Sequence, residues 1–224
     1  MKKAIVLLSG GLDSTVSMAA AINDGYTIKM SLMFDYGQKA FKKEKDAAQK
    51  ISKHYKIAFE CIELPWLKNV TTSSLVNKNK KLPKVSEAEL FDEKLAQENA
   101  KLVWTPNRNG VFLNIAACYA EKMGVDTLIS GFDVEEAQTF PDNSRSFIDA
   151  INSSFYFSTL NHVRVKSYVA ELNKKEIVGL GRHIRVPLNL IWSCYDGGKT
   201  PCGHCESCAR CRRAFKENGL SWLT

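Results

Sequence analysis

A segment rich in glycine and serine, Ser9-Gly10-Gly11-Leu12-Asp13-Ser14, follows an uninterrupted apolar run near the start of the chain. Adjacent glycines permit backbone conformations that other residues avoid, and they let a ligand approach the main chain closely. Free backbone N–H groups of such a turn and of the helix after it converge on one point, which favours an anion such as phosphate. The serine hydroxyls add donors, and the Asp13 carboxylate is suited to orient Mg²⁺. A plain glycine turn, with Asp13 or Ser14 capping the helix, explains only one of these polar side chains.

The spacing of this segment does not match two common phosphate-binding motifs. It lacks the Gly-Lys-Ser/Thr of a Walker loop, and its glycines are not spaced as in a dinucleotide-binding turn. It resembles the PP-loop, Ser-Gly-Gly-x-Asp-Ser, of the ATP pyrophosphatase superfamily. The resemblance implies that the loop holds the β and γ phosphates of ATP, and that cleavage between the α and β phosphates places AMP on the substrate. The residues expected to bind ATP are Leu8, Ser9, Gly10, Gly11, Leu12, Asp13 and Ser14.

A cluster of cysteines near the end of the chain forms a second motif. Five of the seven cysteines lie between residues 194 and 211, in repeated Cys-x-x-Cys spacing. In a reducing cytosol such a cluster indicates metal ligands rather than disulfides. Four thiolates in tetrahedral array suit Zn²⁺, and an iron–sulfur cluster is the alternative. Spacing alone does not say which of the candidate ligands is left out; they are Cys194, Cys202, Cys205, Cys208, Cys211 and His204.

Composition narrows the class of protein. The chain has 224 residues, 45% of them hydrophobic, and a formal net charge of 31 − 24 = +7. This hydrophobic content excludes a disordered chain, and the length predicts one domain with at most a small appendage. No apolar run approaches the roughly 18–20 residues that span a bilayer, and the N-terminal run is too short for a secretory signal, so we expect a cytoplasmic protein. The positive charge suggests anionic ligands without choosing among them.

Apolar periodicity predicts the elements that position these motifs. Expected strands cover residues 4–8, 27–34, 57–64, 125–132 and 162–167, and expected helices cover 13–22, 39–55, 109–123, 146–157 and 174–183. Their alternation predicts an α/β fold with a doubly wound, mostly parallel sheet. We expect residues 1–191 to form the ATP-binding domain, with a polar insertion near 65–106 that holds a helix at 86–98. Residues 192–224 are expected to form a cysteine-rich zinc-binding tail packed on the same domain, with a closing helix at 209–218.

The two motifs together resemble the 7-cyano-7-deazaguanine synthase family of queuosine biosynthesis, within the PP-loop superfamily of adenine nucleotide alpha hydrolase-like fold. Further matching segments are residues 34–38, 106–109, 140–142, 175–178, 192–195 and 202–208. The resemblance implies a ligase that makes a nitrile from 7-carboxy-7-deazaguanine, ammonia and ATP. It also implies Mg²⁺ and a structural zinc ion in each chain, a homodimer, and no stable nucleic-acid partner. The zinc ligands that it implies are Cys194, Cys202, Cys205 and Cys208, which leaves Cys211 spare.

The chemistry of the implied reaction suggests roles for individual side chains, which we state as hypotheses. The glycine loop and Asp13 hold pyrophosphate and Mg²⁺, and either Lys175 or Arg108 clamps the carboxylate or the AMP phosphate. Asp142 is the candidate acceptor for the guanine-like N–H edge. Phe132 or Phe140 stacks on the deazapurine, or else packs in the core; these candidates are read from the printed sequence.

Three other functions fit parts of the sequence. A tRNA-thiolating PP-loop enzyme fits the positive charge, but it needs an accessible thiolate. With four cysteines committed to metal, only Cys61, Cys118 and Cys211 remain, and we expect Cys61 in a strand and Cys118 in an apolar helix to be inert. An ammonia-dependent NAD synthetase is not expected to carry this tail. A zinc-stabilised nucleic-acid-binding module leaves the glycine loop unexplained.

Overall fold

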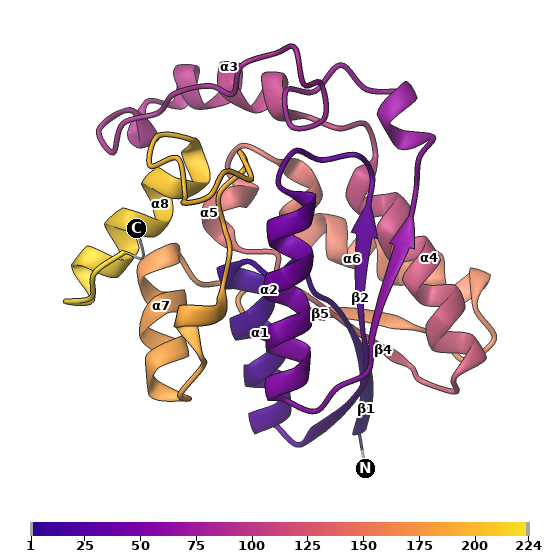
Figure 1. Cartoon of the computed structure of the whole chain (residues 1–224). Coiled ribbons are helices and arrows are strands. Elements are labelled where there is room, and N and C mark those ends of the chain that lie inside the picture. The colour runs from indigo at the N-terminus through magenta and orange to yellow at the C-terminus, as the bar shows by residue number, and fades with distance from the viewer. Residues whose placement is uncertain (1, 223–224) are drawn as a thin grey trace.

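A five-stranded parallel sheet forms the centre of the computed structural model, which describes residues 2–222 (Figure 1). The strand order is β3-β2-β1-β4-β5, and every neighbouring pair is parallel. The strands are β1 (Lys2–Leu7), β2 (Tyr26–Asp35), β3 (Phe59–Glu63), β4 (Thr127–Ser130) and β5 (Arg164–Ser167). The chain runs outward from β1 to β3 and then returns to β4 on the other side of β1. Ligands of such sheets bind where this reversal occurs, at the carboxyl ends of the strands.

Helices cover both faces of the sheet, which confirms the predicted doubly wound α/β fold. Four helices contribute to the core on one face and two contribute to the core on the other. Helices α1, α2, α7 and α8 lie on the first face, and α4 and α6 lie on the second. The α-helices are α1 (Leu12–Asn23), α2 (Phe41–His54), α3 (Glu93–Val103), α4 (Arg108–Lys122), α5 (Val134–Ala137), α6 (Arg145–Ser158), α7 (Lys174–His183) and α8 (Glu206–Glu217).

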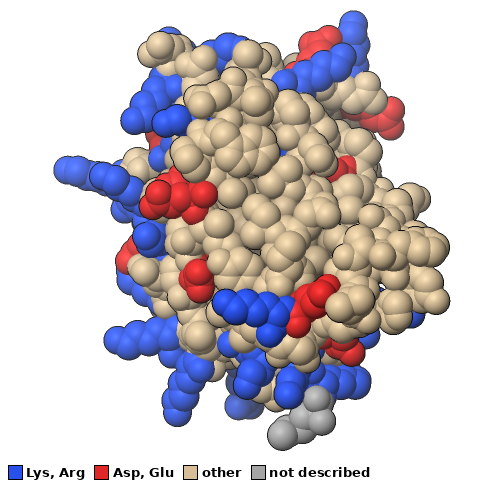
Figure 2. All heavy atoms as spheres, turned by 90° about the vertical axis from the view of Figure 1, so that its right-hand side faces the viewer, with Lys and Arg blue, Asp and Glu red and all other residues tan. Residues whose placement is uncertain are grey.

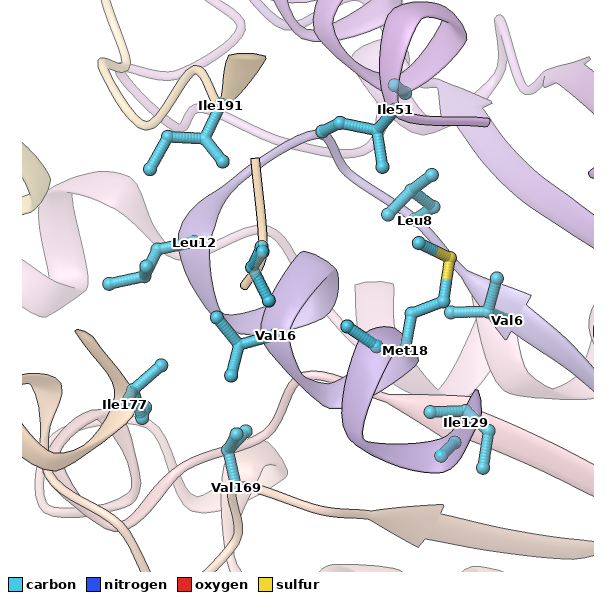
Figure 3. Close-up of a cluster of buried hydrophobic side chains, with 14 of the residues drawn as sticks. Val6, Leu8, Leu12, Val16, Met18, Ile51, Ile129, Val169, Ile177 and Ile191 are labelled. Atoms are coloured by element: carbon cyan, nitrogen blue, oxygen red, sulfur yellow. The ribbon is translucent and has the colours of Figure 1, made fainter. Parts of the chain in front are cut away.

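The central strand β1 shows why a continuous apolar run is needed here. Ala4 and Val6 face the core under α1, whereas Ile5 between them faces the core under α4, and all three are fully buried. Successive side chains of a strand point to opposite faces, so a strand buried on both sides must be apolar throughout. The core under α1 draws on the sheet, on α1 and on α7, whose Ile177 packs there (Figure 3).

The helix predicted within the polar insertion begins later than expected. Helix α3 begins at Glu93 rather than at residue 86, because the Asp92 side chain accepts a hydrogen bond from the Leu95 N–H at 3.0 Å and caps the helix. Only a 3₁₀ turn, η2 (Glu89–Phe91), precedes it. The helix α5 was missed inside the loop after β4. The other 3₁₀ turns are η1 (Leu67–Asn69), η3 (Pro141–Asn143) and η4 (Leu188–Leu190).

None of the helices within residues 2–222 is both long enough and apolar enough to cross a lipid bilayer.

Candidate active site

The glycine loop connects β1 to α1 and leaves the start of α1 uncapped. Gly10 has φ of +80°, and a Cβ there would lie 2.7 Å from the backbone oxygen of Glu44, so only glycine fits. The Ser9 and Ser14 hydroxyls lie 3.0 Å apart, and no side chain in the described part of the chain caps the N-terminus of α1 at Gly11. The first N–H groups of α1 are therefore free to bind an anion.

Two other segments approach this loop closely. A Cβ at Gly131, just after β4, would lie 2.4 Å from the backbone nitrogen of Ser14, so this position also requires glycine. The backbone N–H of Trp192 donates to the Gly10 carbonyl at 2.8 Å. The loop is therefore held between the carboxyl end of β4 and the start of the cysteine-rich tail.

Lys174 lies at the centre of a buried cluster of carboxylates. Its ammonium is 2.7 Å from Asp13, 2.9 Å from Asp133 and 2.8 Å from Glu136. Asp133 follows β4 and caps α5, accepting from the backbone N–H groups of residues 135 and 136. Lys174 begins α7, whose Asn173 forms a capping box. Three carboxylates thus face a single ammonium, at the end of α1 where phosphate would bind.

The electrostatics of this cluster follow from its burial. Burial disfavours a charged lysine, but the three carboxylates hold the pKa of Lys174 well above its ordinary value. Burial raises the pKa of Asp13, and it raises the pKa of Asp133 to about 7, in both cases against the opposing charge of Lys174. The Asp13 Oδ1 atom is buried and has no hydrogen-bond partner among residues 2–222. That oxygen is the one free to reach a cation brought by a ligand.

A cavity opens above the glycine loop and is walled by the ends of β2 and β4, the start of α4 and the tail. Arg108 lines it and donates to the Tyr36 hydroxyl at 3.1 Å. The candidate stacking residues Phe132 and Phe140 also line it, and Phe132 is at the same time part of the core under α4. The Phe140 ring is parallel to that of Trp104, with centroids 6.4 Å apart. The cavity therefore combines a phosphate-binding loop, a guanidinium and aromatic walls.

Three expected contact residues lie elsewhere. The side chain of Lys175 is exposed, and its backbone carbonyl accepts a hydrogen bond from Asn218. The buried lysine of the site is Lys174, one position earlier. One residue along a helix turns the side chain by about 100°, which is why adjacent lysines face differently. Asp142 does not line the cavity, although Phe140 and Asn143 beside it do. The Leu12 side chain packs in the core rather than in the cavity (Figure 3).

Four acidic or basic residues of this region were missed from the sequence: Glu44, Asp133, Glu136 and Lys174. Asp133 offered a recognisable signal, since it follows a buried strand and is followed by Val-Glu-Glu-Ala, which suits a capped helix. Glu44 and Lys174 offered none, because both stand among other lysines and acids on helices that read as solvated.

The cysteines gather as the resemblance implied. Sulfur atoms of Cys194, Cys202, Cys205 and Cys208 all lie within 4.8 Å of one another. A tetrahedral site with Zn–S bonds near 2.3 Å places its sulfurs about 3.8 Å apart, so these four thiols fit a metal of that size. The backbone N–H groups of Cys202 and Cys205 donate to sulfur atoms of the cluster at 3.2 and 3.3 Å, and such donors stabilise thiolates.

The remaining candidate ligands stand apart from this group. Cys211 is buried in the core on α8, and burial raises the pKa of its thiol to about 12. His204 is exposed, with Nδ1 in contact with the Cys202 carbonyl. Cys61 is half-buried in β3, and burial raises the pKa of its thiol. Cys118 was expected to be inert in an apolar helix; it lies in α4 as expected, but on the exposed side of that helix.

An ion-pair network joins the tail to the carboxylate cluster. Arg210 on α8 contacts Glu206 on the same helix at 2.6 Å and Glu135 on α5 at 2.8 Å. Arg213 contacts Glu135 at 2.7 Å. Glu135 also accepts from the backbone N–H of Lys174 at 3.1 Å. Helix α5 thus connects α8, which carries Cys208 of the four-cysteine group, to Lys174 of the carboxylate cluster.

Comparison with known proteins identifies the family. The family model described as "Queuosine biosynthesis protein QueC" matches residues 3–219. A 7-cyano-7-deazaguanine synthase of Bdellovibrio bacteriovorus is 50% identical over 214 residues, covering 96% of this chain and 93% of that protein. One of Pelotomaculum thermopropionicum is 51% identical over 218 residues, covering 97% and 98%.

A solved structure, described as a predicted subunit of a tRNA methyltransferase from Methanocaldococcus jannaschii, has a TM-score of 0.50 at 16% identity. The match covers 99% of this chain and 90% of that one, and it supports the fold alone. The family match and the relatives extend over nearly the whole sequence, from the glycine loop through the cysteine tail. The chain therefore belongs to the QueC family of queuosine biosynthesis proteins.

Proposed function

We propose that the chain is an ATP-dependent C–N ligase that converts 7-carboxy-7-deazaguanine and ammonia to 7-cyano-7-deazaguanine. The observation that carries the proposal is the uncapped start of α1, which opens with Asp13 and Arg108 into one aromatic-walled cavity. Curated relatives about 50% identical to this chain bear the name of that synthase, which supports the same substrate class.

The chemistry explains why a phosphate-binding loop is needed. A carboxylate is a poor electrophile, because its leaving group would be oxide. Attack of its oxygen on the α phosphate of ATP releases pyrophosphate and makes AMP the leaving group. Ammonia then displaces AMP and gives the amide. Attack of the amide oxygen on a second ATP releases another pyrophosphate, and AMP then leaves with that oxygen while the nitrogen loses its two protons, which gives the nitrile. No covalent enzyme nucleophile is required, so catalysis rests on positioning and on charge neutralisation.

The glycine loop and Asp13 serve the pyrophosphate end of ATP in this proposal. The free N–H groups of α1 and the hydroxyls of Ser9 and Ser14 bind its phosphate oxygens. The unpartnered Oδ1 of Asp13 fits Mg²⁺, which when bound neutralises phosphate charge. Lys174 fixes the other Asp13 oxygen at 2.7 Å, and so acts as a positioning residue.

We assign the part of the cavity lined by Arg108, Phe132 and Phe140 to 7-carboxy-7-deazaguanine. Arg108 is held by Tyr36 and offers its remaining N–H groups to a carboxylate or to the AMP phosphate. Phe132 and Phe140 offer faces to the planar deazapurine. Burial raises the pKa of Asp142, against the opposing charge of nearby Arg108. Because Asp142 does not line the cavity, it can contact the N–H edge of the substrate only if the substrate extends beyond the cavity wall.

The tail serves a structural role in this proposal. Four thiols supply all four ligands of a tetrahedral metal site, so no coordination position is left for a reacting water. We assign Zn²⁺ to it, and we assign residues 192–222 to the same folding unit as the sheet, because Arg210 and Trp192 bind that tail to α5 and to Gly10. We also propose that two copies of the chain form a homodimer.

A tRNA-thiolating enzyme is not favoured by the relatives, whose names are those of the nitrile-forming synthase. Exposed Cys118 keeps a free thiol, but it does not line the cavity that contains the glycine loop.

Direct assay of the reaction tests the proposal. Purified protein is incubated with Mg-ATP, ammonium and 7-carboxy-7-deazaguanine, and products are read by mass spectrometry. We expect the nitrile together with AMP, no product without ATP, and at least about a 100-fold loss in Asp13→Asn, since transition-state charge contacts are worth that much. The exposed variant Lys175→Met serves as the control. Unchanged acid in the presence of every reactant contradicts the proposal.

A further inference from the structure

Glu44 is a carboxylate of the cavity that the proposed chemistry has not used. It lies in the first turns of α2 and lines the cavity from the side of β2. Its backbone oxygen would lie 2.7 Å from a Cβ at Gly10, so this turn of α2 packs directly against the glycine loop. The Glu44 side chain therefore faces the place where ATP and the acid would react.

The chain holds this carboxylate in a fixed orientation. Gln38 Nε2 donates to Glu44 Oε2 at 3.0 Å and to the Phe34 carbonyl at 3.0 Å. Gln38 Oε1 accepts from the backbone N–H of Tyr36 at 2.9 Å. Both amide hydrogens of Gln38 are engaged, so it cannot rotate without losing bonds. One oxygen of Glu44 is clamped and the other is left to the cavity.

Glu44 has no cationic partner within residues 2–222. Asp13 and Glu136, which line the same cavity, are both neutralised by Lys174 at 2.7 and 2.8 Å, whereas Glu44 forms no ion pair. A carboxylate inside a cavity is costly unless something pairs with it. An unpaired, oriented carboxylate therefore fits a small cationic or N–H-bearing ligand.

The charges around Glu44 tune it for proton transfer near neutral pH. The pKa of Glu44 is raised to about 7, chiefly by burial and to a smaller extent by the nearby charge of Asp35. The hydrogen bond from Gln38 and the positive charge of Arg108 act in the opposite direction. A general base works best when its pKa lies near the operating pH.

The proposed reaction supplies the matching ligand. At neutral pH ammonia is present chiefly as ammonium, which has no lone pair and cannot attack an acyl adenylate. It must lose a proton inside the cavity, close to the AMP ester. A carboxylate there can bind the ammonium by charge and hydrogen bonds and then accept its proton.

We propose that Glu44 is the ammonium-binding residue and general base of the amidation step, an inference that rests on the proposed function. The Glu44 carboxylate takes one proton from ammonium and becomes a carboxylic acid, leaving ammonia. The nitrogen lone pair forms the C–N bond to the acyl carbon, and the C–O bond to AMP breaks with its electron pair on the phosphate oxygen. The second proton lost from nitrogen leaves with solvent.

The two halves of the reaction separate this role from ATP binding. Exchange of labelled pyrophosphate into ATP, with the acid present and ammonium absent, reports adenylation alone. Conversion of acid to amide at varied ammonium reports the step assigned to Glu44. The variant is Glu44→Gln, which keeps size and polarity but cannot accept a proton. The matched control is Asp46→Asn on the same helix, where the carboxylate is exposed and pairs with Lys50.

In Glu44→Gln we expect pyrophosphate exchange within a few-fold of wild type and amidation at pH 7 reduced about 100-fold or more. Its amidation at fixed total ammonium should rise steeply with pH, following free ammonia, whereas that of the wild type should be much flatter. Glu44→Asp should fall between the two, and Asp46→Asn should match the wild type.

Several results would overturn the role of Glu44. The first is amidation by Glu44→Gln at the rate of the wild type. The second is loss of pyrophosphate exchange, or a raised KM for the acid, in that variant, because either result would mean that Glu44 contacts ATP or the deazapurine instead of ammonium. If Glu44→Gln does not fold, Glu44→Asp and the wild-type pH profile decide: amidation by wild type that only tracks free ammonia contradicts the proposal. A wild type that neither exchanges pyrophosphate nor forms nitrile instead overturns the proposed function itself.

Discussion

Lys174 is the residue whose removal should cost the molecule most. Its ammonium is the common partner of Asp13, Asp133 and Glu136, and its side chain is 4% exposed. In Lys174→Met these carboxylates remain buried without a cation. We expect urea unfolding at pH 7 to show a loss of about 3 kcal/mol or more, as for other broken buried ion pairs.

The neighbouring Lys175→Met is the control for this prediction. Lys175 is exposed, so its loss should change the unfolding free energy by less than about 0.5 kcal/mol. In Lys174→Met the pKa values of Asp13 and Asp133, which burial already raises, should rise further, and Glu136 should lose the charge that holds its pKa below the ordinary value. The destabilisation should therefore shrink as pH falls below about 4, where these groups become protonated in both states. Equal stability of the two variants at pH 7 would contradict the central place of Lys174.

Glu44 predicts a gain of stability at the expense of activity. Because burial raises its pKa to about 7, the folded state holds a proton that the unfolded state, with an ordinary pKa of 4.5, has lost. Wild-type stability therefore falls as pH rises from about 4.5 to about 7, and Glu44→Gln does not share this fall. We expect Glu44→Gln to be more stable than wild type at pH 8 by about 1–3 kcal/mol, and equal to it at pH 4, in urea titrations. A difference independent of pH would exclude this cause.

The candidate site shows where sequence patterns stop being informative. The glycine loop and the cysteine cluster were predictable, because each places its functional atoms within a few residues of one another. Lys174 was not, because its role depends on Asp13 and Asp133, which reach it from other elements. The residues around Lys174 in the sequence do not distinguish it from Lys175. The packing of α7 against α1 does, because it buries one lysine and leaves the other exposed.

Elements were predicted best where the apolar pattern is clear, along one face of a helix or throughout a buried strand. Helix α7 was predicted with its observed bounds, and β1, α1 and β2 were predicted to within two residues at either end. Helix α5 is four residues long and carries adjacent acids, so it has no apolar stripe to detect. Its stability comes from the Asp133 cap and from pairing of Glu135 with Arg210, a residue far along the chain.

The tail predicts a sharp contrast between two cysteines of α8. Cys208 belongs to the four-thiol group, whereas Cys211, three residues later, packs in the core. Metal analysis should find zinc in wild type and in Cys211→Ala, and should find it lost from Cys208→Ala. Zinc loss should lower the unfolding free energy by several kcal/mol, because binding energy of a structural site is folding energy.

Removal of zinc by a chelator should reproduce the effect of Cys208→Ala in the wild type. Because Trp192 binds the glycine loop and Arg210 binds α5, the same treatment should also weaken ATP binding. Iron and sulfide in a coloured protein would contradict the assignment of zinc.

At the scale of the whole molecule, charge decides where two copies could meet. Each chain carries a formal net charge of +7, so like-charge repulsion opposes association over most of the surface. The face formed by α4, α6 and the connection to β5 shows a broad area with few Lys, Arg, Asp or Glu side chains (Figure 2). Phe157 and Leu160, in and just after α6, are 86% and 90% exposed.

The proposed homodimer should therefore use this face, through a two-fold contact in which each copy presents the same patch. We expect the double variant Phe157→Ser and Leu160→Ser to be monomeric in sedimentation experiments at micromolar concentration, with its unfolding free energy nearly unchanged because both side chains are exposed. Phe91→Ser, at an aromatic residue 72% exposed in the insertion, is the matched control and should stay dimeric. Removing apolar area at Phe91 lowers surface hydrophobicity in the same way, so dissociation in both variants would point to non-specific association. A wild type that sediments as a monomer would exclude the dimer itself.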